Sequence, residues 1–164
     1  MSLLTWLSTT GPAVWMRESE SVWAYPTILF LHTLGLGILV GFTAAIDIRV
    51  LGFSEQLPLA PLERFFRFVW IGFWINAVSG AALLIMMPSK VSNPAFVAKM
   101  TFIAFGVANI WLLRRRVFRD PATRGLVTVP FAGKVLAAAS LVLWAGAITA
   151  GRLMAYVGPE LVKK

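Results

Sequence analysis

The segment TILFLHTLGLGILVGFTAAIDIRVLG, residues 27–52, decides the fold class of this chain. From about residue 22 to residue 46 the chain is almost entirely apolar, interrupted only by Tyr25, Pro26 and His32. A helix that crosses a bilayer needs about 20 such residues, so the run predicts a membrane-spanning helix. It also contains the only histidine of the chain, His32, at a position where an ionisable side chain is costly.

The composition of the whole chain agrees with a membrane protein. Of 164 residues, 59% are hydrophobic and only 13% are charged, which is too few charges to cover a soluble domain of this size. The net charge is +8, but most lysines and arginines lie between the apolar runs, so we expect contacts with lipid headgroups and none with nucleic acid. Cysteine is absent, which excludes disulfides and thiolate metal sites.

Four spans in total are predicted, because three further runs are apolar and long enough. The predicted spans are residues 22–46, 68–87, 94–116 and 135–157. The short connections between them are typical of antiparallel neighbours in a bundle. The sequence therefore predicts an all-α fold, an integral membrane four-helix bundle formed by residues 21–164, with Pro94 opening the third helix.

The first twenty residues and the distribution of cations indicate how the bundle sits in a membrane. Residues 1–20 contain Trp6 and Trp15 and predict a short helical segment lying in the interface. Nine of the 15 lysines and arginines lie on the side of the connections that follow the first and third spans, including the triplet Arg114 to Arg116. The positive-inside rule then predicts that the connections after the first and third spans are cytoplasmic and that both termini lie on the outer side of the membrane.

Polar side chains occur at a similar depth in all four predicted spans. His32, Ser79, Lys99 and Arg152 each fall in the outer half of their span, and Tyr25 lies above His32. Ionisable side chains inside a span usually face the bundle interior or a water-filled cavity. Their common depth therefore predicts one outer-half pocket built on His32.

Each of these residues also has a purely structural interpretation. His32 can form a hydrogen bond with a neighbouring backbone or hydroxyl group, and Asn76 and Ser79 can join helices in the same way. Lys99 and Arg152 are close enough to the outer boundary to extend toward the headgroups.

Two other features of the first span carry predictions. Gly37, Gly41 and Ala44 lie nearly opposite His32, and such a small-residue face lets another helix approach, either from a second copy or from a larger membrane complex. In the sequence DIR, we expect Asp47 and Arg49 to form an ion pair at the inner interface.

The predicted pocket fits two organic cofactors. Haem b would take His32 as an axial ligand, with its propionates held by Lys99 and Arg152. A quinone headgroup would need only hydrogen bonds, from His32 and Ser79. Asn76 and Tyr25 complete the candidate binding residues, and a pocket that holds no ligand is the remaining possibility.

Copper is the alternative ligand. Thioethers and an imidazole are soft donors that suit Cu(I), and His32, Met87 and Met100 are the candidate ligands at the outer side. The positive charges of Lys99 and Arg152 would oppose a bound cation. No acidic side chain shares the depth of His32, so a hydrolytic or nucleophilic site of the Ser-His-Asp kind is not expected.

The chain resembles a bacterial family of small four-helix membrane proteins known only as a domain of unknown function. The resemblance covers most of the chain and rests on ESVWAYPTILFLHTLGLGILVG (20–41), DIRVLG (47–52), INAVSG (75–80) and NPAFVAKMTFIAFGVAN (93–109). It implies the fold and a location in the bacterial inner membrane, so that both termini would lie in the periplasm, and it implies no activity.

A more distant resemblance links His32 and the segment from Phe96 to Lys99 to the CopD-type copper-resistance membrane proteins, although this chain has fewer spans and fewer histidines. The functional prediction is a haem- or quinone-binding subunit of an electron-transfer assembly. Copper handling at the periplasmic face and a structural accessory role are the alternatives.

Overall fold

The computed structural model describes residues 6, 8–11, 14, 23–53, 56–119 and 129–156. Within these ranges the chain forms no strand, and its long helices are α3 (Ala24–Leu51), α4 (Phe65–Met86), α5 (Pro94–Leu113) and α6 (Phe131–Tyr156). All four helical regions are long and apolar enough to cross a membrane. The predicted all-α, four-helix fold is confirmed, and it is compatible with a multi-pass membrane protein in contact with the bilayer.

The predicted interfacial segment at residues 1–20 lies mostly outside the described residues. The part that is described contains a turn, in which the Thr9 N–H donates to the Trp6 carbonyl at 3.1 Å. Trp6 is exposed. The interfacial location of the segment stays a prediction.

The helices extend beyond the apolar runs that predicted them. α3 continues through the polar residues Asp47 and Arg49 and ends at Leu51. Gly52 caps it, and its φ of 106° is the left-handed conformation that glycine adopts readily. α6 begins at Phe131, four residues before the predicted span. Hydropathy marks the part of a helix suited to hydrocarbon, whereas capping and turn residues decide where the helix stops.

Short helical turns replace the predicted linkers. A 3₁₀ helix, η1 (Ala60–Arg64), leads into α4, and a second one, η2 (Pro88–Ser92), connects α4 to α5. A π-helical turn, η3 (Arg114–Phe118), extends α5. Pro94 opens α5 as predicted, and the Asn93 side chain caps it by accepting a hydrogen bond from the Ala95 N–H at 2.9 Å.

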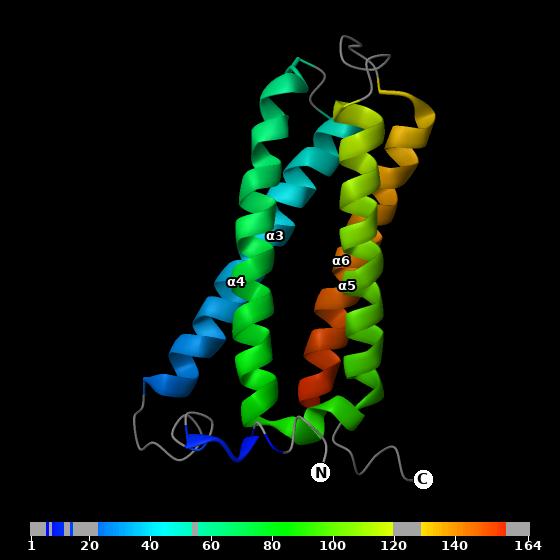
Figure 1. Ribbon diagram of the computed structural model, residues 1–164. Helices are drawn as coiled ribbons and strands as arrows, with labels where there is room; N and C mark the ends of the chain where they lie inside the picture. The colour runs from blue at the N-terminus through cyan, green and yellow to red at the C-terminus, as the bar shows by residue number, and fades with distance from the viewer. Residues whose placement is uncertain are drawn as a thin grey trace.

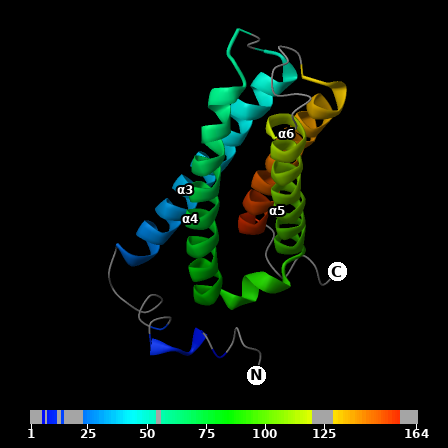
Figure 2. The same cartoon turned by 45° about the horizontal axis from the view of Figure 1, so that its top comes forward.

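The four helices are arranged as two antiparallel pairs. α3 packs against α4, α5 packs against α6, and contacts between α3 and α6 hold the pairs together, whereas contact between α4 and α5 is slight at most. α3 crosses behind α4, and α6 crosses behind α5 (Figures 1 and 2). We call the end of the bundle near η2 the η2 end and the end near η1 and η3 the η1 end.

The apolar core fills only part of the bundle. It lies toward the η1 end and includes Leu39, Ile46, Val50, Phe66, Val69, Ile110, Leu113, Val117, Phe118 and Trp144. Toward the η2 end the first turns of α3 diverge from the other helices (Figure 1). The polar residues of the predicted pocket lie in this half, where the apolar core does not reach.

Candidate functional site

Two glycines set the distance between α3 and α4 beside the candidate site. A Cβ atom added to Gly35 would lie 2.6 Å from the Asn76 backbone nitrogen, and one added to Gly72 would lie 2.6 Å from the Leu39 backbone nitrogen. The two backbones are therefore in direct contact at this crossing, as small residues allow. The close approach places His32 of α3 next to the α4 turn that contains Asn76, Ser79 and Gly80.

His32 and Asn76 join α3 to α4 by two hydrogen bonds. The imidazole Nδ1 lies 3.0 Å from the Asn76 backbone oxygen, and Asn76 Nδ2 donates to the His32 backbone oxygen at 2.7 Å. Gly80 makes room for the ring, since a Cβ at this position would lie 2.9 Å from His32 Cε1. His32, through its Nδ1, and Asn76 therefore act as interhelical hydrogen-bonding groups, as their structural interpretation predicted.

The hydrogen-bond partners assign the tautomer of His32. The Asn76 carbonyl can only accept, and the Ser79 hydroxyl, 3.2 Å from Nδ1, donates to the Ile75 backbone oxygen at 2.6 Å. Nδ1 therefore carries the proton and Nε2 carries a lone pair. That lone pair faces Lys99 of α5, whose Nζ lies 3.4 Å from Nε2.

Lys99 is half-buried between α3 and α6. A Cβ added to Gly151 of α6 would lie 3.7 to 3.9 Å from Lys99 Cδ, Cε and Nζ, so the lysine side chain passes beside that glycine. All four helices thus contribute to one site, formed by His32, Asn76, Ser79, Gly80, Lys99 and Gly151. An ammonium group has three N–H donors, and His32 Nε2 accounts for one of them.

Several predicted residues lie outside this site. Tyr25 is exposed at the start of α3, and Arg152 is exposed on α6 one residue beyond the glycine that contacts Lys99. Met87 and Met100 are also exposed. None of the four shows a hydrogen bond from its side chain to the described residues, and the structure does not gather them around His32.

Sequence reasoning missed the contribution of two glycines. Gly80 provides the space for the imidazole ring, and Gly151 is the residue of α6 that faces the Lys99 side chain. Gly80 lies on the same face of its helix as Asn76 and Ser79, so the helical period could have indicated that it faces His32. Gly151 had no such signal, because its role depends on how α6 is rotated against α5.

A separate group of polar side chains is buried toward the η1 end. Asp47 and Ser140 are fully buried and Trp144 is 2% exposed. Ser140 lies close enough to interact with the Asp47 carboxyl group, yet neither Asp47 oxygen, nor the Ser140 hydroxyl, nor Trp144 Nε1 has a hydrogen-bond partner of good geometry in the described structure.

The predicted ion pair between Asp47 and Arg49 is wrong. Arg49 is buried, and its Nε donates to the Leu57 backbone oxygen, while both Asp47 oxygens lack a partner among the described residues. Residues two positions apart lie on different faces of a helix, so adjacency in the sequence DIR does not bring the two side chains together.

The donor set around His32 does not fit a metal ion in the arrangement observed. A cation bound at Nε2 would have to displace Lys99 Nζ and remain beside its positive charge. Across the described ranges, histidine and acidic side chains do not gather in any group of three that could hold a metal. The same objection applies to haem iron, whereas a neutral or anionic oxygen acceptor suits the lysine.

Comparison with other proteins does not assign this site. No known protein family, curated protein or solved structure matches the chain. The resemblance inferred from the sequence therefore stays a prediction, and the function has to be argued from the geometry of the site.

Replacing Asn76 by leucine is expected to lower the free energy of unfolding by about 1 kcal/mol, because the hydrogen bond to the His32 backbone is lost inside a membrane-spanning helix pair. The measurement is an SDS titration in mixed micelles followed by circular dichroism. The control is Thr33→Val, which removes only a local bond to the Leu29 oxygen on an exposed face of α3. Equal losses in the two variants would contradict the interhelical role of Asn76.

Proposed function

We propose that this protein binds a quinone headgroup at Lys99 and His32 and serves as a non-hydrolytic subunit of an electron-transfer assembly in the bacterial inner membrane. One observation carries the proposal: the lone pair of His32 Nε2 faces Lys99 Nζ at 3.4 Å in the half of the bundle that the apolar core does not reach. The orientation with both termini in the periplasm is part of the proposal and rests on the distribution of cations.

The pair offers both kinds of hydrogen-bonding group that a quinone requires. The ammonium of Lys99 donates to a quinone carbonyl oxygen, and its charge strengthens that bond. When the headgroup is a hydroquinone, its hydroxyl would donate to His32 Nε2 in place of the Lys99 ammonium, because that nitrogen has a single lone pair. Asn76 and Ser79 act through the ring, because they hold Nδ1 and thereby keep the lone pair on the side of Lys99.

Quinone analysis tests the proposal. The purified protein is incubated with decylubiquinone in detergent, and the bound quinone is measured after extraction. The Lys99→Met variant is expected to bind about tenfold more weakly, because it loses a charge-assisted hydrogen bond while keeping an unbranched side chain only one atom shorter. The control is Lys90→Met, which removes a lysine at the same end that bonds to the Met154 backbone oxygen at 3.4 Å.

Two outcomes would overturn the quinone assignment. Equal binding by the wild type, Lys99→Met and His32→Ala would show that the pair does not hold the headgroup. A Soret band in protein expressed with haem supply, lost in His32→Ala, would replace quinone by haem.

Copper found at equal, negligible levels in the wild type and His32→Ala would remove copper handling from consideration.

A structural accessory role is the second candidate, and the exposed face of α3 favours it. Nothing lies within 4 Å of a Cβ added to Gly37 or Gly41, so this face is open to another helix from a second copy or from a larger complex. Ala44, one turn further along, is partly buried. This role predicts that Gly37→Leu disrupts assembly, measured by crosslinking in native membranes, while His32→Ala leaves assembly intact.

A further inference from the structure

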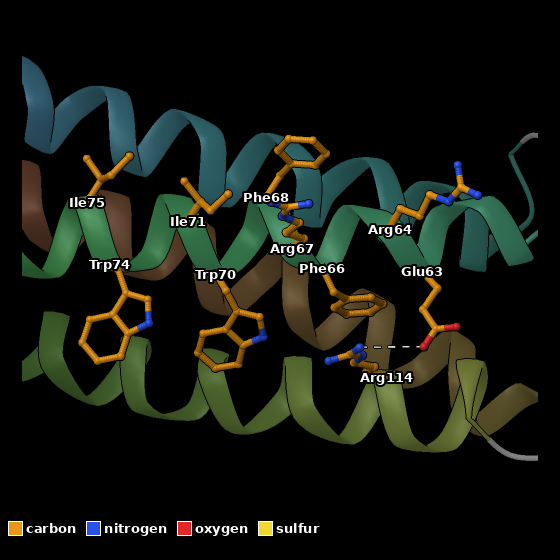
Figure 3. A pocket seen from close by; sticks show the side chains of 10 residues that line it. All are labelled: Glu63, Arg64, Phe66, Arg67, Phe68, Trp70, Ile71, Trp74, Ile75 and Arg114. Carbon is orange, nitrogen blue, oxygen red and sulfur yellow. Dashed lines mark ion pairs between the residues drawn. The ribbon is translucent and has the colours of Figure 1, made fainter.

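A groove runs along the exposed face of α4, toward the η1 end. It has a volume of about 1000 Å³, and Figure 3 shows its lining: Glu63, Arg64, Phe66, Arg67, Phe68, Trp70, Ile71, Trp74, Ile75 and Arg114. It arises because α4 and α5 scarcely touch, so the bundle leaves this face of α4 uncovered. We call it the α4 groove.

One end of the α4 groove is positively charged. Arg64 at the end of η1 and Arg67 of α4 are exposed and form no ion pair with any residue that the structure describes. Arg114 reaches across from η3. Its Cζ lies 5.4 Å from the centroid of the Phe66 ring, and its Nη2 lies 3.8 Å from Glu63 Oε1. Three guanidinium groups against one carboxylate leave an excess of positive charge at this end.

The other end of the α4 groove is apolar. Trp70 and Trp74 project from α4 toward α5, whereas Ile71 and Ile75 lie along the other edge of α4, on the side of α3 (Figure 3). Trp74 is 61% exposed and Ile71 is 42% exposed, so a molecule in the groove would meet uncovered apolar surface. From Arg64 to Ile75 the groove extends roughly 16 Å along the helix axis.

We propose that the α4 groove binds an anionic phospholipid from the leaflet at the η1 end, with its phosphate on Arg64 and Arg67 and an acyl chain along Trp70 and Trp74. The length of the groove is close to that of a single leaflet, about 15 Å of hydrocarbon. The arginines favour a phosphate headgroup, since one guanidinium group can donate two parallel hydrogen bonds to two phosphate oxygens. Basic pockets between membrane-spanning helices hold acidic lipids in this way.

The two ends of the groove together exclude other occupants. A quinone carries no negative charge for the arginines, and a partner helix would cover the whole thickness of the membrane rather than half of it. A water-soluble anion would leave the walls formed by Trp70, Ile71 and Trp74 uncovered. An acidic lipid satisfies both the charged end and the apolar end.

Native mass spectrometry tests the proposal on the full chain in detergent. The protein is mixed with phosphatidylglycerol or with phosphatidylcholine carrying the same acyl chains, and the lipid retained is titrated. We expect phosphatidylglycerol to be retained preferentially. Arg64→Gln with Arg67→Gln should weaken its binding about thirtyfold, because each arginine near an acidic lipid contributes about a factor of five.

A matched double variant separates the groove from the general charge of this end. Arg115→Gln with Arg119→Gln removes two exposed cations at the same end that do not line the groove, and it should change the affinity less than about twofold. Trp74→Ala keeps all the arginines and should weaken the retention of long-chain phosphatidylglycerol. All three variants should keep the wild-type melting curve, because the side chains they alter are exposed.

The proposal would be overturned if the wild type retained the two lipids equally. It would also be overturned if the control double variant lost as much phosphatidylglycerol as the groove variant, since the arginines would then act only as diffuse surface charge. Retention that is unchanged in Trp74→Ala would remove the acyl chain from the groove and overturn the assignment of a lipid.

Discussion

Replacing Gly72 by alanine is expected to lower the free energy of unfolding by about 3 kcal/mol or more. The added Cβ would lie 2.6 Å from the Leu39 backbone nitrogen and 2.8 Å from the Gly35 oxygen. Backbone atoms cannot rotate away as a flexible side chain can, so α3 and α4 must separate along their whole contact, and overpacking of this kind is costly. The intrinsic helix preference of alanine over glycine, about 1 kcal/mol, acts in the opposite direction and is too small to compensate.

Gly37→Ala is the matched control for this prediction. Gly37 also lies within a membrane-spanning helix, but no atom lies within 4 Å of the position of its Cβ. We expect this variant to keep or slightly raise the free energy of unfolding, measured by SDS titration in mixed micelles. If both variants were destabilised alike, the contact between the Gly35 and Gly72 backbones would not be what holds α3 against α4.

Replacing Trp144 by alanine is expected to lower the free energy of unfolding by about 3 to 5 kcal/mol. Trp144 belongs to α6 and is 2% exposed. Its ring lies on Gly106 of α5, where an added Cβ would be 3.1 Å from Cζ2. The indole nitrogen has no hydrogen-bond partner in the described structure, so packing and not hydrogen bonding is what the substitution removes.

Trp74→Ala provides the corresponding control. The same change of side chain occurs there on the open face of α4, where the tryptophan is 61% exposed, and we expect a change below about 0.5 kcal/mol. Thermal melting followed by circular dichroism gives an independent measurement for both tryptophan variants. A loss at Trp74 comparable to that at Trp144 would mean that lipid contact and packing between α5 and α6 contribute alike.

Much of the fold could be predicted from local sequence. Apolar runs long enough to span a bilayer gave four helices, and Pro88 and Pro94 marked the end of one and the start of another. The helical period also placed Gly37 and Gly41 nearly opposite His32. Gly35, Thr43 and Asp47 lie on the buried side of α3, whereas Gly37 and Gly41 are exposed.

The candidate site could be predicted only in part. Depth alone brought His32, Ser79 and Lys99 to the same level, and the structure brings these side chains together. Depth also selected Arg152. Successive residues of a helix point about 100° apart, however, and in the structure Gly151 faces Lys99 while the next residue, Arg152, does not. The predicted ion pair between Asp47 and Arg49 was wrong for the same reason, because two side chains close in sequence on a helix can point in different directions.

The sequence by itself determined the number of spans, their approximate limits and the depth of each polar residue. These follow because the energy of placing a segment in hydrocarbon depends mainly on that segment. Only the tertiary structure decided which side chains meet, since contact requires the distance and rotation between helices. The Gly35–Gly72 crossing sets that distance for His32, and the slight contact of α4 with α5 leaves the α4 groove open.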